Sequence, residues 1–210
     1  MNNLEKFHSL EFTLDRTLIF KIMNEELFDI AIIGNGIIGN LAALVALEKG
    51  YKVAIIGPKE KKIRQDHADA RAYAISPAAN KLINFCGLSD AIDQESENIK
   101  KMEIFHNSKK LIFDSNEVKK KYLARIVNHR TLLNICKKAV EKNKNLVHIT
   151  NTPNNFKITN KYSQELAEIN FKSMQTDFNV LSKLIIGADG INSWCRHNAG
   201  IVWGRKNYNQ

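Results

Sequence analysis

Three glycines near the start of the chain have the spacing of a turn that holds phosphate groups. They are Gly34, Gly36 and Gly39, in the sequence Gly-Asn-Gly-Ile-Ile-Gly. In this pattern the first glycine permits a tight turn, the second lets the backbone approach a pyrophosphate, and the third allows close helix packing. Free N–H groups at the helix start then face the phosphates. The spacing predicts a dinucleotide-binding turn, and the alternative is a purely structural turn.

A second segment that could carry chemistry lies near the end of the chain. Residues 187–196 read Gly-Ala-Asp-Gly-Ile-Asn-Ser-Trp-Cys-Arg and hold Asp189 and Gly190 directly after an apolar run. An aspartate between two glycines is also common in ordinary turns. The downstream Ser193 and Arg196 favour a cofactor site over that simpler explanation.

Two arginines stand in further segments that could meet a diphosphate. Arg71 lies in residues 69–76, Asp-Ala-Arg-Ala-Tyr-Ala-Ile-Ser, and Arg130 ends residues 125–130, Arg-Ile-Val-Asn-His-Arg. A guanidinium suits a diphosphate because it forms charge-assisted, often bidentate, hydrogen bonds. The alternative for both residues is an ordinary surface charge.

Together these four segments resemble the FAD-dependent aromatic hydroxylases of the para-hydroxybenzoate hydroxylase type. Their order and separations are similar to those of the branch that hydroxylates polyprenylated phenols in ubiquinone biosynthesis. The resemblance implies FAD as cofactor, NAD(P)H or another electron donor, and a small aromatic substrate. No catalytic side chain is expected because flavin chemistry belongs to the cofactor. The FAD-contacting residues that the resemblance implies are Gly34, Gly36, Gly39, Arg71, Arg130, Asp189 and Gly190.

One expected residue of the dinucleotide-binding pattern is absent. An acidic residue at the end of the second strand normally holds the ribose hydroxyls. The position is Gly57 here, followed by Pro58, and the nearest carboxylate is Glu60. Either Glu60 reaches back to the ribose, or ribose binding relies on other contacts.

The elements that must position these residues follow from the hydrophobic pattern. A buried strand at 29–33, a helix at 37–49 and a second buried strand at 51–56 form a βαβ unit. We therefore expect an α/β fold with a Rossmann-type FAD-binding domain and a partial antiparallel substrate-domain sheet. Ser76 and Pro77 predict a helix start. Further expected elements are hairpins near 99–113 and in 155–172, a helix at 130–142 and short strands at 123–127, 146–150 and 184–186.

Composition sets the protein class. The chain has 210 residues, of which 44% are hydrophobic and 25% charged, as in a folded globular protein. The net charge of +9 is spread over many polar stretches, so we expect a solvated surface and no nucleic-acid partner, with peripheral membrane contact as the alternative. Its three cysteines are far apart and its histidines isolated, which favours a reduced cytoplasmic compartment and no metal site. No apolar run reaches the roughly 18 residues of a membrane-spanning helix.

The organisation along the chain leaves several alternatives open. Residues 1–22 are a leader or precede the true start at Met23, and residues 23–210 form the FAD-binding domain with inserted β segments at about 99–122 and 155–183. The resemblance implies that a C-terminal half is lacking. That half is supplied by a separate chain, or the sequence is a fragment or a remnant. We expect little or no hydroxylase activity from the chain alone.

Two other functional classes fit parts of the sequence. One is a non-catalytic nucleotide-binding component, or remnant, in a ubiquinone-synthesis complex, favoured by Gly57 in place of an acid. The other is a different FAD oxidoreductase, such as an amine or glycine oxidase, and residues 187–196 argue against it.

Overall fold

The computed structural model describes residues 26–58, 70–172, 177–204 and 206. They belong to two compact units, one formed by Met1–Lys59 and Lys144–Gln210 and the other by Glu60–Asn143. The glycine turn and the Asp-Gly segment both belong to the first unit, whereas the two arginines belong to the second.

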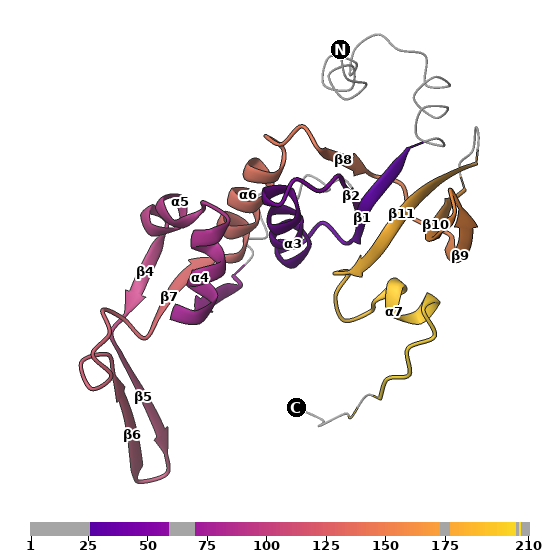
Figure 1. The fold of residues 1–210 in the computed structure, drawn as a ribbon. Helices are drawn as coiled ribbons and strands as arrows, with labels where there is room; N and C mark the ends of the chain where they lie inside the picture. The colour runs from indigo at the N-terminus through magenta and orange to yellow at the C-terminus, as the bar shows by residue number, and fades with distance from the viewer. Residues whose placement is uncertain (1–25, 59–69, 173–176, 205, 207–210) are drawn as a thin grey trace. The chain divides into compact units, whose positions relative to one another are not determined.

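The first unit is built on one six-stranded sheet of order β8-β2-β1-β11-β10-β9 (Figure 1). The four strands from β8 to β11 are parallel, and β10 and β9 continue the sheet in antiparallel fashion. Its elements are β1 (Leu27–Ile33), α3 (Ile37–Glu48), β2 (Val53–Ile56), β8 (Leu146–Ile149), β9 (Asn155–Lys161), β10 (Gln164–Phe171), β11 (Phe178–Gly187) and α7 (Trp194–Asn198).

The central parallel strands β1 and β2 are largely apolar, as expected for strands buried inside a sheet. All four residues of β2 are buried, as is the run Ala31–Ile33 of β1. Helix α3 packs on β1 and β2 and buries Ala43, Leu44 and Leu47. The predicted βαβ unit is therefore confirmed, with β1 beginning slightly earlier and β2 slightly later than expected.

The antiparallel part confirms the second predicted hairpin and extends it. β9 and β10 pair from Gln164↔Lys161 to Asn170↔Asn155, and β10 continues onto β11. Phe171 and Phe178 stack with ring centroids 4.6 Å apart where β10 leads into β11. β11 is much longer than the expected 184–186 because its first half pairs with β10 and its second half with β1.

The second unit contains a three-stranded antiparallel sheet and three helices. The sheet order is β3-β7-β4. The helix start predicted from Ser76 and Pro77 is confirmed, since the Ser76 hydroxyl accepts a hydrogen bond from Ala79 N at 3.2 Å. The sequence does not predict strands β3 and β4 or helix α5. The elements are β3 (Ala72–Ile75), α4 (Pro77–Phe85), α5 (Ser89–Gln94), β4 (Ser96–Ile99), β7 (Ala124–Asn128) and α6 (His129–Val140).

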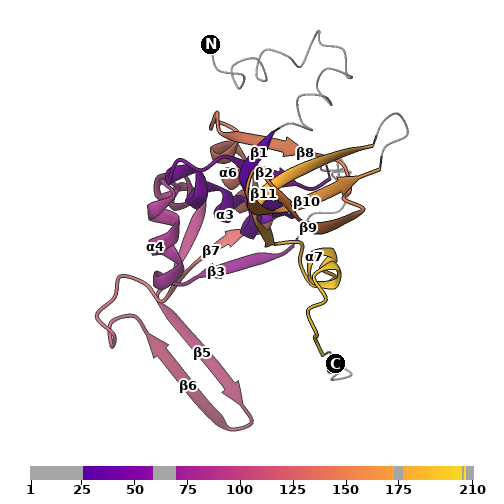
Figure 2. The same ribbon diagram turned by 45° about the vertical axis from the view of Figure 1, so that its right-hand side comes forward.

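The other predicted hairpin forms a separate two-stranded sheet, β5 (Lys101–His106) with β6 (Lys109–Asp114) (Figure 2). Cross-strand partners share a face, and faces alternate along each strand. One face therefore carries two apolar pairs, Met102 with Phe113 and Ile104 with Leu111, and all four side chains are exposed.

Among the residues that the structure describes, no helix is long and apolar enough to cross a membrane.

Asp29, near the start of β1, is a carboxylate whose ionisation contributes to the stability of the fold. Asp29 accepts hydrogen bonds from Lys183 Nζ on β11 at 2.7 Å and from Lys52 N before β2 at 2.9 Å. The Lys183 ammonium and then the Lys52 amide lower the pKa of Asp29 below its ordinary value of 3.8. A lowered pKa in the folded state means that this contribution is present above about pH 4 and is lost as the pH falls further.

Asp29→Asn is expected to reduce the acid sensitivity of the first unit. Because the pair is partly exposed, the variant loses only about 0.5–1 kcal/mol at neutral pH, and the difference from the wild type shrinks below pH 4. Urea unfolding between pH 3 and pH 7 measures this, with Glu48→Gln, an exposed carboxylate on α3, as the matched control. An equal difference between wild type and Asp29→Asn at both ends of the pH range contradicts the assignment.

Candidate FAD-binding site

The glycine turn follows β1 directly and is fixed by backbone contacts on both sides. Gly34 N donates to Ile56 O of β2 at 2.7 Å, and Gly34 has a φ of +113°, which only glycine adopts readily. A Cβ atom at Gly34 would lie 2.3 Å from the carbonyl oxygen of Ala188. Gly34 therefore serves both the turn and the contact with the Asp-Gly segment.

The third glycine brings the helix onto the turn. A Cβ atom at Gly39 would lie 1.9 Å from Gly34 O and 3.6 Å from Ala188 Cβ. Close helix packing was the role predicted for Gly39, and the structure shows why no side chain is tolerated.

The start of α3 is open toward solvent, as a phosphate site requires. Gly36 is the N-cap residue, with extended backbone and no side-chain cap, and the first turn holds no acidic residue. A Cβ atom at Gly36 would meet nothing within 4 Å. The first N–H groups of a helix have no partner within the helix, and the helix dipole favours an anion there. This geometry fits the diphosphate of FAD.

A buried asparagine, not recognised in the sequence, holds the turn in place. Asn40 is 3% exposed, and its Nδ2 donates to Asn35 O at 2.7 Å and to Gly36 O at 2.8 Å. Its only sequence signal is a polar residue on the apolar face of α3. Asn40 therefore satisfies two carbonyl groups of the glycine turn.

The Asp-Gly segment lies beside the glycine turn because β11 and β1 are parallel neighbours. Ile33 pairs with Gly187, and Ala188 N donates to Ile33 O at 2.7 Å. Both turns therefore leave the sheet at the carboxyl ends of adjacent parallel strands, where ligands bind in open α/β sheets. Gly190 has a φ of +82°.

Asp189 directs its carboxylate into its own segment. Oδ1 accepts from Ser193 Oγ at 2.6 Å, and Oδ2 accepts from Cys195 N at 2.9 Å. Ser193 Oγ in turn accepts from Arg196 N and caps α7. The spacing of Asp, Ser and Arg is thus explained first by the folding of this turn, and contact of Asp189 with FAD stays a prediction.

Asp189→Ala is expected to lower the free energy of unfolding by about 2 kcal/mol, because two donors lose their acceptor. The amides of Cys195 and Arg196 then exchange with solvent faster. Hydrogen exchange of α7 measures this, with Asn192→Ala, an exposed neighbour, as the control. Unchanged protection of α7 in Asp189→Ala would contradict the anchoring role.

The two arginines predicted to contact FAD lie on neighbouring segments of the second unit. Arg71 O accepts from His129 N at 2.9 Å, and Arg130 follows His129 as the second residue of α6. Both arginine side chains are exposed. Tyr73, two residues after Arg71, joins the two segments through its hydroxyl, which lies 3.0 Å from His129 Nδ1. The contacts of Arg71 and Arg130 with FAD stay predictions.

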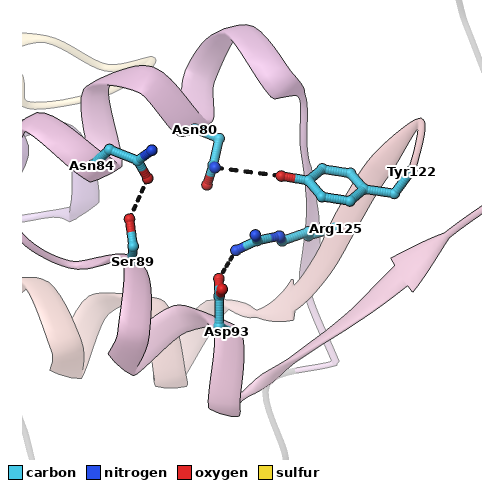
Figure 3. A network of polar contacts seen from close by, with 6 residues as sticks. All are labelled: Asn80, Asn84, Ser89, Asp93, Tyr122 and Arg125. Carbon is cyan, nitrogen blue, oxygen red and sulfur yellow. Dashed lines mark hydrogen bonds and ion pairs between the residues drawn. The ribbon is translucent and has the colours of Figure 1, made fainter. Parts of the chain in front are cut away.

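The arginine that begins the same segment has a structural role (Figure 3). Arg125 forms an ion pair with Asp93 of α5, and its guanidinium lies over the ring of Tyr122, 4.8 Å from the centroid. Asn80 Nδ2 donates to the Tyr122 hydroxyl at 3.3 Å, so α4 joins the same network. Arg125 therefore links β7 to helices α4 and α5, and we do not assign it a contact with the phosphates.

A cleft of about 810 Å³ opens in the first unit beside the Asp-Gly segment. Its polar lining residues include Asp189, Ser193 and Arg196, and the Arg196 guanidinium lies 4.5 Å from the Trp203 ring centroid. The apolar lining residues include Phe156, Ile158, Leu184, Ile185 and Ile201. Exposed apolar surface of this kind marks a place where another molecule or chain segment packs.

The cysteines offer no competing chemistry. Cys86, Cys136 and Cys195 are buried and form no disulfide. Burial, and to a lesser degree Cys86, raises the pKa of Cys136 to about 12, while burial and then Asp189 raise that of Cys195. A raised thiol pKa disfavours the nucleophilic thiolate. Over the described residues no cluster of His, Cys, Asp and Glu is suited to a metal.

At Gly57, where the dinucleotide-binding pattern has an acidic residue for the ribose, the Asn35 side chain occupies the space of the absent side chain. A Cβ atom at Gly57 would lie 2.9–3.1 Å from the Asn35 side chain. Glu60, the other carboxylate considered for this role, lies outside the described residues.

Comparison with known proteins identifies this arrangement. The chain is 27% identical over 183 residues to 3-demethoxyubiquinol 3-hydroxylase of Escherichia coli (strain K12), covering 85% of this chain and 45% of that protein. Its fold is similar to p-nitrophenol 4-monooxygenase PnpA of Pseudomonas putida DLL-E4, with a TM-score of 0.70 at 16% identity, covering 85% and 45% of the two chains. It is also similar to aklavinone-11 hydroxylase in its complex with FAD and aklavinone, with a TM-score of 0.67 at 16% identity, covering 87% and 37%.

The chain thus spans about half the length of the curated relatives it matches, or slightly less. The model of the family described as FAD binding domain matches residues 28–208, which include both turns of the first unit and the arginines of the second. The chain belongs to this FAD binding domain family.

Proposed function

We propose that this chain is the FAD-holding part of a monooxygenase that hydroxylates a polyprenylated phenol in ubiquinone biosynthesis. The observation that carries the proposal is the junction of the glycine turn with the Asp-Gly segment at the carboxyl ends of β1 and β11. The relative from Escherichia coli named 3-demethoxyubiquinol 3-hydroxylase supports the substrate class.

In this proposal different residues of the chain contact different parts of FAD. Backbone N–H groups after Gly36 hold the diphosphate, Arg71 and Arg130 add positive charge, and the turn around Asp189 and Gly190 borders the flavin. Bound FAD supplies the redox chemistry, with NAD(P)H or another donor as the source of electrons. The chain's own residues bind and orient the cofactor.

We further propose that a C-terminal half, as a separate chain or segment, covers the cleft beside the Asp-Gly segment. The support is the exposure of the cleft residues Ile158, Leu184 and Ile201, each more than half exposed, together with the length of the relatives. On this proposal the isolated chain has weak or no hydroxylase activity, and the substrate pocket is completed by the added part.

The experiment follows oxygen from ¹⁸O₂ into a short-chain prenylphenol by mass spectrometry. It uses the chain alone and the chain mixed with the C-terminal part of the Escherichia coli relative, each with FAD and NADH or NADPH. We expect labelled product only with the added part. Absence of product from a mixture that binds FAD contradicts the hydroxylase proposal, and efficient turnover by the chain alone contradicts the need for a second part.

A polyprenylated substrate resides in the membrane, and the β5–β6 hairpin supports peripheral contact there. Its apolar face, Met102, Ile104, Leu111 and Phe113, ends at the tip with the pair His106 and Lys109. Apolar side chains next to lysines suit an anionic lipid surface, where each basic residue contributes about 1 kcal/mol.

Ile104→Asp is expected to reduce sedimentation with phosphatidylglycerol vesicles at least fivefold, because it places a charge in the apolar face. Ile112→Asp, on the opposite face beside Glu103, is the matched control and keeps most of the binding. Neutral phosphatidylcholine vesicles bind weakly in all cases. Failure of the wild type to bind anionic vesicles contradicts this contact.

A further inference from the structure

The adenosine ribose of a dinucleotide is normally held by an acid at the end of the second strand. Here that position is Gly57, and the space for its side chain is occupied. A Cβ atom at Gly57 would lie 2.9 Å from Asn35 Cγ, 3.0 Å from Asn35 Oδ1 and 3.1 Å from Asn35 Cβ. Contacts this short exclude a side chain at residue 57 unless Asn35 moves.

The orientation of the Asn35 amide is fixed by its neighbours. Asn35 Nδ2 donates to Pro58 O at 2.7 Å. A carbonyl oxygen only accepts hydrogen bonds, so the nitrogen must face Pro58 and Oδ1 must face away from it. The Asn35 backbone is held separately, because its carbonyl accepts from the buried Asn40. The result is a preorganised acceptor beside the end of β2.

We propose that Asn35 replaces the missing acid, with its Oδ1 accepting a hydrogen bond from a hydroxyl of the adenosine ribose of FAD. The inference rests on the proposed function, since it requires FAD at the glycine turn. It also explains why residue 57 is a glycine, because the Asn35 side chain occupies the space that a side chain at residue 57 would need. A neutral acceptor gives a weaker hydrogen bond than a carboxylate, so the expected effect is moderate.

The first test removes the acceptor and, separately, its partner hydroxyl. Asn35→Ala raises the Kd for FAD and for ADP about fivefold to tenfold. Of 2′-deoxy-ADP and 3′-deoxy-ADP, the analogue lacking the bound hydroxyl binds wild type and Asn35→Ala equally. Calorimetry of the folded proteins measures this. If Asn35→Ala weakens ADP and both deoxy analogues by the same factor, Asn35 acts only by shaping the turn, and the inference is wrong.

The second test exchanges the two residues. Gly57→Glu alone weakens FAD binding at least tenfold, because the new side chain meets Asn35. Asn35→Gly combined with Gly57→Glu recovers wild-type affinity or better, because it clears the space and restores a carboxylate. A double variant that binds no better than Gly57→Glu overturns the inference.

Different results would contradict the proposed function and the role of Asn35. A folded wild-type chain that binds neither FAD nor ADP contradicts the proposed function itself. A wild-type chain that binds FAD while Asn35→Ala binds it equally well leaves that function standing and contradicts only the role of Asn35.

Discussion

Gly39→Ala is expected to destabilise the first unit by about 3 kcal/mol or more, enough to leave much of the chain unfolded. The added Cβ would lie 1.9 Å from Gly34 O and 2.9 Å from Gly34 C. Gly34 cannot move away from Gly39, because the Gly34 N–H donates to Ile56 O and the Gly34 Cα packs against the Ala188 backbone. The strain therefore has to be relieved by moving α3 away from the sheet.

Urea unfolding followed by far-UV circular dichroism measures this loss. Gly36→Ala is the matched control, because a Cβ there meets nothing within 4 Å, and it costs less than about 1 kcal/mol. If both variants unfold at the same urea concentration, the close packing of α3 on the glycine turn is not what makes Gly39 necessary.

Gly36→Asp is expected to change stability and FAD affinity in opposite directions. Gly36 is the N-cap of α3, which lacks a side-chain cap. Aspartate is a favoured N-cap residue and suits the helix dipole, so the free energy of unfolding rises by about 0.5–1 kcal/mol. The same carboxylate stands where the FAD diphosphate binds and weakens FAD binding at least a hundredfold, or about 3 kcal/mol.

Gly36→Asn separates the two effects, because it caps the helix without adding charge. We expect the same gain in stability with a smaller loss of FAD affinity. Fluorescence titration with FAD and urea unfolding of the three proteins provide the comparison. Unchanged FAD affinity in Gly36→Asp would mean that the diphosphate does not bind at the start of α3.

The elements of the βαβ unit could be predicted because their signals are local. The second half of β1 and the whole of β2 are continuous apolar runs, and Gly34 ends the first of them at a conformation that other residues avoid. The proximity of the Asp-Gly segment could be expected only through the family resemblance. It results from the pairing of Ile33 with Gly187, a contact between residues far apart in the chain that no local pattern encodes.

The polar contacts inside the turns could not be predicted, because they depend on side-chain direction. Asn40 is a single polar residue in an apolar helix, and only the structure shows that it binds two turn carbonyls. Arg125 and Arg130 lie in one short segment, and the structure distinguishes them through the ion pair of Arg125 with Asp93. The space shared by Asn35 and Gly57 likewise appears only in three dimensions.

Calorimetric titration of the purified, folded wild-type chain with FAD and with FMN tests the central claim most directly. Because the adenosine diphosphate part of FAD is proposed to bind at the glycine turn, we expect one FAD bound per chain and binding of FMN at least tenfold weaker. A folded chain that binds no FAD, or that binds FMN as tightly as FAD, would contradict it.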